Sequence, residues 1–122
     1  MNYNTNQSIF IQIADRISDR VLSGDYKADE RIPSVRELAV EMEVNPNTVM
    51  RSFERLQNYN IIYNKRGIGY FISIEANDKI RQMRQSQFVE EVLPTVFREM
   101  QLLCIGIEEL NNAYEIYNKK QS

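Results

Sequence analysis

The spacing of apolar residues changes twice along the chain, and this constrains the fold more than any other feature of the sequence. Up to Asn60, apolar residues recur every three or four positions, as on one face of a helix. Two short β-branched and aromatic runs follow, 61–63 and 70–74, and the helical spacing returns from Glu75 onward. The sequence therefore predicts a group of helices, then one β-hairpin, then further helices.

Start and stop signals divide the first sixty residues into three helices. Ser8 is a good N-cap for the first, and Gly24 stands where a helix commonly ends. Ser34, with a glutamate three residues later, forms a capping box for the second helix. Asn45 and Pro46 open the third, because asparagine caps well and proline at the first helical position loses no hydrogen bond.

The segment between the two expected strands, 65–69, is basic and contains glycine. Lys65 and Arg66 precede a Gly-Ile-Gly run, which is typical of a hairpin tip. The run is not a nucleotide-binding fingerprint, because it lies between strands and opens no helix. Three helices followed by a hairpin are the layout of a winged helix-turn-helix. We therefore expect an α+β fold, mainly α.

The third helix carries the residues that most suggest a function. At about 100° per residue, the face opposite its apolar stripe presents Asn47, Thr48, Arg51 and Arg55. Such side chains reach base edges and phosphates from the major groove of DNA. The segment from Asn45 to Ile72 contains four basic residues and one acidic residue, although the net charge of the chain is −2. A solvated helix face would show the same pattern, so the helix alone leaves both readings open.

A longer sequence pattern favours DNA binding over an ordinary solvated helix face. The residues that form it are Gly24-x-Tyr26, Arg31-Ile32-Pro33-Ser34-x-Arg36-x-Leu38-Ala39, Val44-Asn45-x-Asn47-Thr48-Val49, Leu56 and Gly67-x-Gly69-Tyr70-Phe71. Over about residues 8–74 this pattern resembles the N-terminal domain of GntR-type bacterial transcription regulators. The short C-terminal extension is similar to that of the YtrA subfamily, in which two helices serve as the dimerisation element.

The resemblance implies binding to operator DNA, with the third helix in the major groove and the wing against the minor groove or backbone. By position, Arg36 matches a DNA-contacting arginine of the second helix. The start of the recognition helix and the wing supply the other matches. The expected DNA-binding residues are Ser34, Arg36, Asn45, Asn47, Thr48, Arg51, Arg55, Lys65, Arg66, Gly67 and Gly69.

The chain departs from the family pattern at four positions. Asp29 and Asn60 stand where the family often has glycine, and both residue types tolerate left-handed backbone. Many relatives have arginine at the positions of Pro46 and Met50, so the base contacts of those relatives do not carry over to this chain.

The C-terminal part is expected to form two helices. An apolar stripe runs from Ile80 to Leu103, interrupted by Pro94, and a shorter amphipathic helix follows Gly106. Two helices alone would leave a contiguous apolar patch exposed, which indicates an interface. We expect a DNA-binding domain at 1–74 and a dimerisation region at 75–122. The expected interface residues are Phe88, Val92, Val96, Phe97, Met100, Leu103, Leu110 and Tyr114.

The composition excludes several classes of site. Histidine is absent and Cys104 is the single cysteine, so the chain offers no His-based triad, no zinc site and no internal disulfide. Cys104 is interpreted as a small apolar filler. No apolar run is long enough to span a bilayer, and the polar stretch Met1–Ser8 contains no apolar signal segment. We expect a cytoplasmic protein that is not an enzyme and has no metal or cofactor.

These observations together predict a homodimeric bacterial transcription regulator, a repressor, that binds a palindromic operator. The alternative is a winged-helix module that docks on a protein and does not bind DNA. Basic residues on the third helix and the wing favour DNA, whereas an acidic or apolar outer face would favour a protein partner. The sequence identifies no effector.

Overall fold

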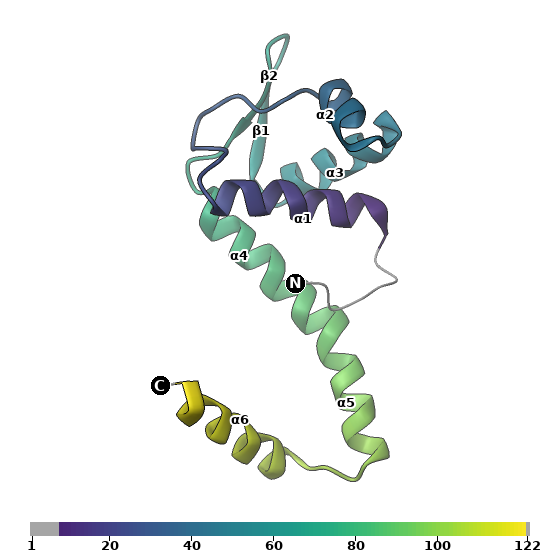
Figure 1. The fold of residues 1–122 in the computed structure, drawn as a ribbon, viewed down its shortest axis with the longest axis vertical. Coiled ribbons are helices and arrows are strands. Elements are labelled where there is room, and N and C mark those ends of the chain that lie inside the picture. Colours follow the sequence, from purple (N-terminus) through teal and green to yellow (C-terminus); the bar gives the residue numbers. More distant parts are fainter. Residues whose placement is uncertain (1–7, 122) are drawn as a thin grey trace. The chain divides into compact units, whose positions relative to one another are not determined.

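The computed structural model describes residues 8–121, so the expectation for the polar N-terminal stretch falls almost wholly outside the described residues. The elements occur in the order α1 (Ile9–Leu22), α2 (Val35–Met42), α3 (Pro46–Asn58), β1 (Ile62–Lys65), β2 (Gly69–Ile72), α4 (Ala76–Gln87), a π-helical segment η1 (Phe88–Val92), α5 (Leu93–Leu102) and α6 (Ile107–Gln121) (Figure 1). The chain forms two compact units that divide between Gln85 and Ser86. The predicted fold class, mainly helical with a two-stranded wing, is confirmed.

The first three helices begin where their capping residues predict. Ser34 accepts a hydrogen bond from the Glu37 N–H at 3.1 Å, and the Glu37 carboxylate accepts one from the Ser34 N–H at 3.0 Å, which completes the capping box. Asn45 Oδ1 accepts the Asn47 N–H at 2.8 Å, with proline at the first position of α3. Ser8 has extended backbone dihedrals, but its hydroxyl makes no capping bond.

The wing is an antiparallel hairpin with a short tip. Ile62 pairs with Ile72 and Lys65 pairs with Gly69, so the strands reach closer to the tip than the sequence suggests. Ile74, expected in the second strand, lies beyond it and is exposed. The predicted left-handed residues are confirmed at both positions, with φ of 62° at Asp29 and 60° at Asn60.

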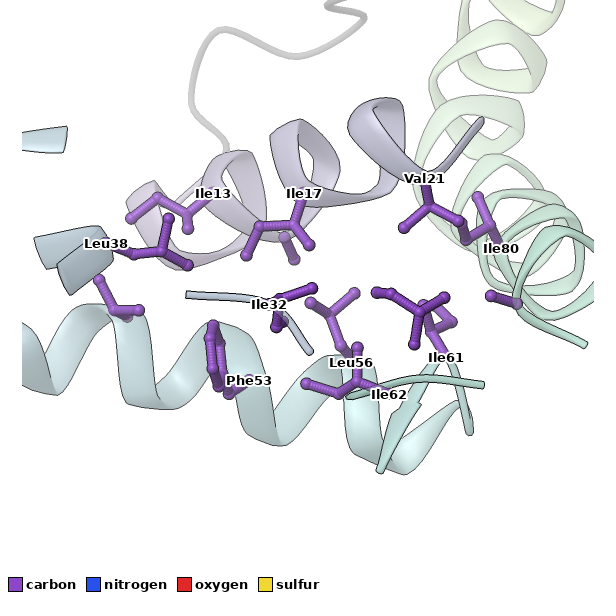
Figure 2. Packing of buried hydrophobic residues seen from close by; sticks show 14 of the residues in the cluster. Ile13, Ile17, Val21, Ile32, Leu38, Phe53, Leu56, Ile61, Ile62 and Ile80 are labelled. Carbon is purple, nitrogen blue, oxygen red and sulfur yellow. The ribbon is translucent and has the colours of Figure 1, made fainter. Parts of the chain in front are cut away.

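The hydrophobic core of the first unit lies between α1, α2, α3, the hairpin and the start of α4. Figure 2 shows Ile17 of α1 facing Phe53 and Leu56 of α3, while Val21 lies next to Ile80 of α4. All five side chains are buried. A helix with one apolar stripe is stable only when another element covers that stripe, and α1 and α3 cover one another.

The first compact unit extends beyond the boundary expected at residue 74. Ala76, Ile80 and Met83 of α4 are buried in the same core as the first three helices. Arg84 adds a polar link, because its Nη2 donates to the Asp15 carbonyl at 3.1 Å and to Asp19 Oδ1 at 2.8 Å. Ile80 and Met83, the first two residues of the C-terminal apolar stripe, therefore belong to the core of the first unit.

The second unit contains η1, α5 and α6, and none of its described residues is buried. Pro94 occupies the first turn of α5, directly after the π-helical segment, which is where the sequence predicts an interruption. Cys104 follows α5 with φ of 57° and is exposed, so its interpretation as a buried filler is wrong for the isolated chain. Among residues 8–121, no helix has both the length and the apolar character needed to cross a bilayer.

Candidate DNA-binding surface

Helix α3 has one buried face and one outward face, as a recognition helix requires. Val49, Phe53 and Leu56 are fully buried, and Ser52 is buried beside them. The Ser52 hydroxyl donates to the Phe10 carbonyl at 2.6 Å, which fixes α3 against the start of α1. The outward face is therefore held by packing and by a hydrogen bond on the opposite side of the helix.

At the start of α3, one of the expected DNA-binding residues caps the helix and the next two are accessible to solvent. The Asn45 side chain is engaged as the N-cap, so its amide oxygen stabilises the first turn. Asn47 is exposed, and its side chain makes no hydrogen bond within residues 8–121. Thr48 is half-buried next to it. Asn47 and Thr48 are thus available to an outside partner at the positive end of the helix dipole.

The start of α2 shows the same division. The Ser34 hydroxyl is used in the capping box, whereas Arg36 is exposed in the first turn. Arg36 forms no hydrogen bond or ion pair with the rest of the described chain. An exposed guanidinium without a protein partner retains its full donor capacity for phosphate or a base.

Arg51 is exposed, but its side chain turns toward α1. Its guanidinium carbon lies 4.3 Å from the centroid of the Phe10 ring, a cation–π arrangement. Together with Glu54, Asn58 and neighbouring residues of α3, this pair lines an open hollow of about 490 Å³. The outward direction expected of Arg51 from the helical wheel is therefore modified by a contact from another helix.

Arg55 lies one turn beyond Arg51 on α3 and lines the same open hollow. Its Nε atom is buried without a hydrogen-bond partner among the described residues, and its guanidinium lies 5.6 Å from the Tyr59 ring centroid. Burial raises the pKa of the Asp15 carboxyl of α1, while the charges of Arg84 and Arg55 oppose this rise. No hydrogen bond or ion pair joins Arg55 to Asp15 in the described part of the chain. The role of Arg55 at DNA stays a prediction.

One cation of the wing, Lys65, lies against a pair of stacked aromatic rings. The Tyr63 and Phe71 rings are stacked, with centroids 5.7 Å apart, and Lys65 Nζ lies 4.4 Å from the Phe71 centroid. The Tyr63 hydroxyl donates to Asp29 Oδ1 at 2.9 Å, and this bond raises the pKa of Tyr63. Lys65 is exposed and held along the hairpin instead of extending freely from it.

The tip of the wing differs from its stem. Arg66 is exposed at the tip, and Gly67 adopts φ of 81° with open space around its α-carbon. Gly69 is different, because Arg31 Nε lies 2.9 Å from the position that a Cβ would take there. Arg31 was not among the site residues predicted from the sequence. The isolated antiparallel bridge with Phe71 that brings it to the wing exists only in the folded chain.

All eight expected dimer-interface residues lie in the second unit. Phe97, Leu103 and Tyr114 are exposed by 44%, 63% and 64%, far above what an apolar or aromatic side chain shows in a core. Phe88 and Val96 are also exposed, whereas Val92, Met100 and Leu110 are half-buried. Their role at an interface stays a prediction.

The helical core, the capped recognition helix and the basic hairpin define a winged helix-turn-helix DNA-binding protein. Bacterial regulatory proteins of the gntR family match residues 11–72, which is half of the chain. The chain therefore belongs to the GntR family, a family of DNA-binding transcriptional regulators, and the family resemblance drawn from the sequence is confirmed.

Individual relatives extend the similarity into the C-terminal region. The chain is 32% identical over 108 residues to YhcF of Bacillus subtilis (strain 168), an uncharacterized HTH-type transcriptional regulator, over 88% of each protein. It is 33% identical to the HTH-type transcriptional repressor YtrA of the same organism, over 69% of this chain and 65% of YtrA. A crystal structure of a GntR-family regulator from Bacteroides thetaiotaomicron has a TM-score of 0.74 and 46% identity, covering 94% of this chain and all of that one.

Proposed function

We propose that this regulator is a cytoplasmic repressor that binds a two-fold symmetric operator as a homodimer. The observation that carries the proposal is the group of unpartnered polar side chains on α2, α3 and the wing of a GntR fold. The side chains of Arg36, Asn47 and Arg66 are exposed and make no hydrogen bond or ion pair among the described residues. The similar YtrA protein of Bacillus subtilis is named a transcriptional repressor.

In this proposal α3 enters the major groove with its N-terminal end leading. Asn47 carries both a donor and acceptors for a base edge, and Thr48 offers a hydroxyl and a methyl group. Arg36 and the wing cations Lys65 and Arg66 contact the phosphate backbone on either side of that groove. Among the α3 residues expected to bind DNA, Arg55 is half-buried beside Tyr59 and lies farthest from the leading end of the helix.

The dimer follows from the exposed apolar surface of the second unit. A soluble protein seldom leaves several large apolar side chains exposed on adjacent helices unless another molecule covers them. Phe97, Leu103 and Tyr114 meet this description. A second copy related by a two-fold axis covers the same surface on both subunits and places two recognition helices on two half-sites.

The alternative of a protein-binding module predicts a different outer face. Docking helices usually present an apolar stripe or a charge pattern that complements the partner. Here the exposed positions of the first turns of α2 and α3 include arginine and asparagine instead. This composition favours a phosphate-rich partner.

The test is an electrophoretic mobility shift with DNA from upstream of the protein's own gene, followed by footprinting. We expect a discrete complex at nanomolar to micromolar protein concentrations and protection of two symmetric half-sites. A complex of the same strength with unrelated DNA, or no complex at low salt, would overturn the operator-binding proposal. Sedimentation of the free protein reports the dimer independently.

A further inference from the structure

Arg31 lies between the two groups of cations proposed to contact DNA. It forms the antiparallel bridge with Phe71, and the next residue donates its N–H to the Tyr70 carbonyl at 2.9 Å. The preceding Glu30 carbonyl accepts the Ile72 N–H at 3.0 Å. The backbone of Arg31 is therefore fixed to the edge of the two-stranded wing by a single-residue bridge, three residues before the N-cap of α2.

The side chain of Arg31 lies over Gly69 of the wing. A Cβ atom on Gly69 would lie 2.9 Å from Arg31 Nε and 3.5 Å from both Cζ and Nη2. Because a contact below about 3 Å is sterically unfavourable, a side chain at position 69 would push the guanidinium away from the wing. Gly69 also has φ of 146°, a conformation that favours glycine.

The charge of Arg31 reaches α2 as well as the wing. Hydrogen bonds from Ser34 lower the pKa of Glu37, and Arg31 contributes to this lowering. Across the hairpin, the strand partner of Gly69 is Lys65, a second cation of the wing. Arg31 itself is exposed.

We propose that Arg31 is a phosphate contact that joins the cation of α2 and the cations of the wing into one backbone-binding strip. This inference rests on the proposed DNA binding. The Arg31 guanidinium is exposed and makes no hydrogen bond or ion pair among the described residues, so it can bind phosphate through two parallel N–H groups. Because phosphate is the same at every position, the contribution of Arg31 is independent of DNA sequence.

The experiment measures the affinity of the full-length protein for a labelled 30-bp duplex of random sequence at several salt concentrations. Arg31→Ala is compared with Arg16→Ala, which removes an exposed arginine of α1 without a hydrogen bond or ion pair among the described residues. We expect Arg31→Ala to weaken binding several-fold and to reduce the slope of log K against log[salt] by about 1 for each bound subunit. Arg16→Ala should behave like the wild type.

A matched pair of glycine substitutions tests the placement of the guanidinium. Gly24→Ala and Gly69→Ala both strain a residue with positive φ, but only the second puts a Cβ where the Arg31 guanidinium lies. We expect Gly69→Ala to displace the guanidinium and reduce the salt slope, and Gly24→Ala, which lies outside the expected DNA-binding residues, to leave the slope unchanged. The double variant Arg31→Ala/Gly69→Ala should lose no more slope than Arg31→Ala alone.

The outcomes separate the inference from the function on which it rests. Wild-type protein that binds no duplex even at low salt overturns the proposed DNA binding. Wild-type protein that binds with a steep salt slope, together with an unchanged slope for Arg31→Ala, overturns the inference alone. A weaker affinity of Arg31→Ala with the wild-type slope and a lowered melting temperature assigns Arg31 a purely structural role and also overturns it.

Discussion

The guanidinium of Arg51 lies over the ring of Phe10, with Cζ 4.3 Å from the ring centroid, and this contact ties the recognition helix to the first turn of α1. The two residues are 41 positions apart in the chain. The Ser52 hydroxyl bonds the carbonyl of the same phenylalanine, so two neighbouring residues of α3 are attached to one residue of α1. A substitution of Arg51 therefore removes a contact between α3 and α1 as well as a side chain of the proposed DNA-binding surface.

Replacing Arg51 with alanine should affect both roles. We expect a loss of roughly 1–3 kcal/mol in specific binding, because a long side chain next to the start of α3 is removed from the DNA surface. The lost cation–π contact should cost about 0.5–1 kcal/mol of unfolding free energy. Phe10→Leu is the matched control, since it removes the ring and keeps the charge. Equal operator affinity of Arg51→Ala and wild type would remove Arg51 from the DNA surface.

The salt dependence of binding counts the charges at the interface. If Arg36, Arg51, Lys65 and Arg66 of two subunits meet DNA, about 6–8 counterions are displaced and the slope of log K against log[salt] should be roughly −5 to −7. Lys65→Ala should weaken binding to operator and random DNA about equally, since phosphates carry no sequence information. A slope near zero would favour the protein-partner alternative.

Truncation distinguishes the two compact units. A chain that ends at Gln85 keeps Ala76, Ile80 and Met83 in the core and should fold as a monomer. A chain that ends at Ile74 loses all three, and burial of two large apolar side chains alone is worth about 1.5–3 kcal/mol each. Circular dichroism melting and sedimentation report the outcome. An equally stable chain ending at Ile74 would contradict the assignment of α4 to the first core.

A charge placed on α5 should dissociate the proposed dimer. Phe97→Glu would bury an unpaired carboxylate against the second subunit, which is costly in an apolar interface. Thr95→Glu adds the same charge to the same helix, on a side about 200° away, and serves as control. We expect sedimentation to show monomers for Phe97→Glu and dimers for Thr95→Glu. A stable Phe97→Glu dimer would place the interface elsewhere.

Asp15 should make stability depend on pH. Burial raises the pKa of its carboxyl in the folded state, with Arg84 and Arg55 opposing the rise. Between the unfolded and the folded pKa, the folded protein binds more protons, so the free energy of unfolding falls as pH rises. Asp15→Asn has no carboxyl at this position, so its free energy of unfolding should lack this fall at pH values above the ordinary pKa of an aspartate.

Urea unfolding at closely spaced acidic pH values measures this effect. Asp25→Asn, which removes an exposed carboxyl, is the matched control and should follow the wild-type curve. Curves of the same shape for Asp15→Asn and wild type would contradict the assigned burial.

Much of this protein was determined by signals that act within a few residues of one another. The capping box at Ser34, the asparagine cap of α3 and the left-handed residues Asp29 and Asn60 are local devices, and each occurs where the sequence predicts it. The order of three helices and a hairpin follows from them, because each cap or turn needs only its immediate neighbours. The residue pattern of the family spans the same helices and hairpin and could also be recognised from the sequence.

Only the tertiary structure shows which side chains from distant parts of the sequence contact one another. Arg51 turns to Phe10, Arg84 bonds to Asp15 and Asp19, Arg31 lies against Gly69, and α4 joins the first core through Ile80 and Met83. A helical wheel gives the direction of a Cβ atom but does not show which residues of another helix lie next to it. The contacts of long cationic side chains were therefore the hardest to predict. The physical reason is that caps are local interactions, whereas these contacts exist only after the helices have packed.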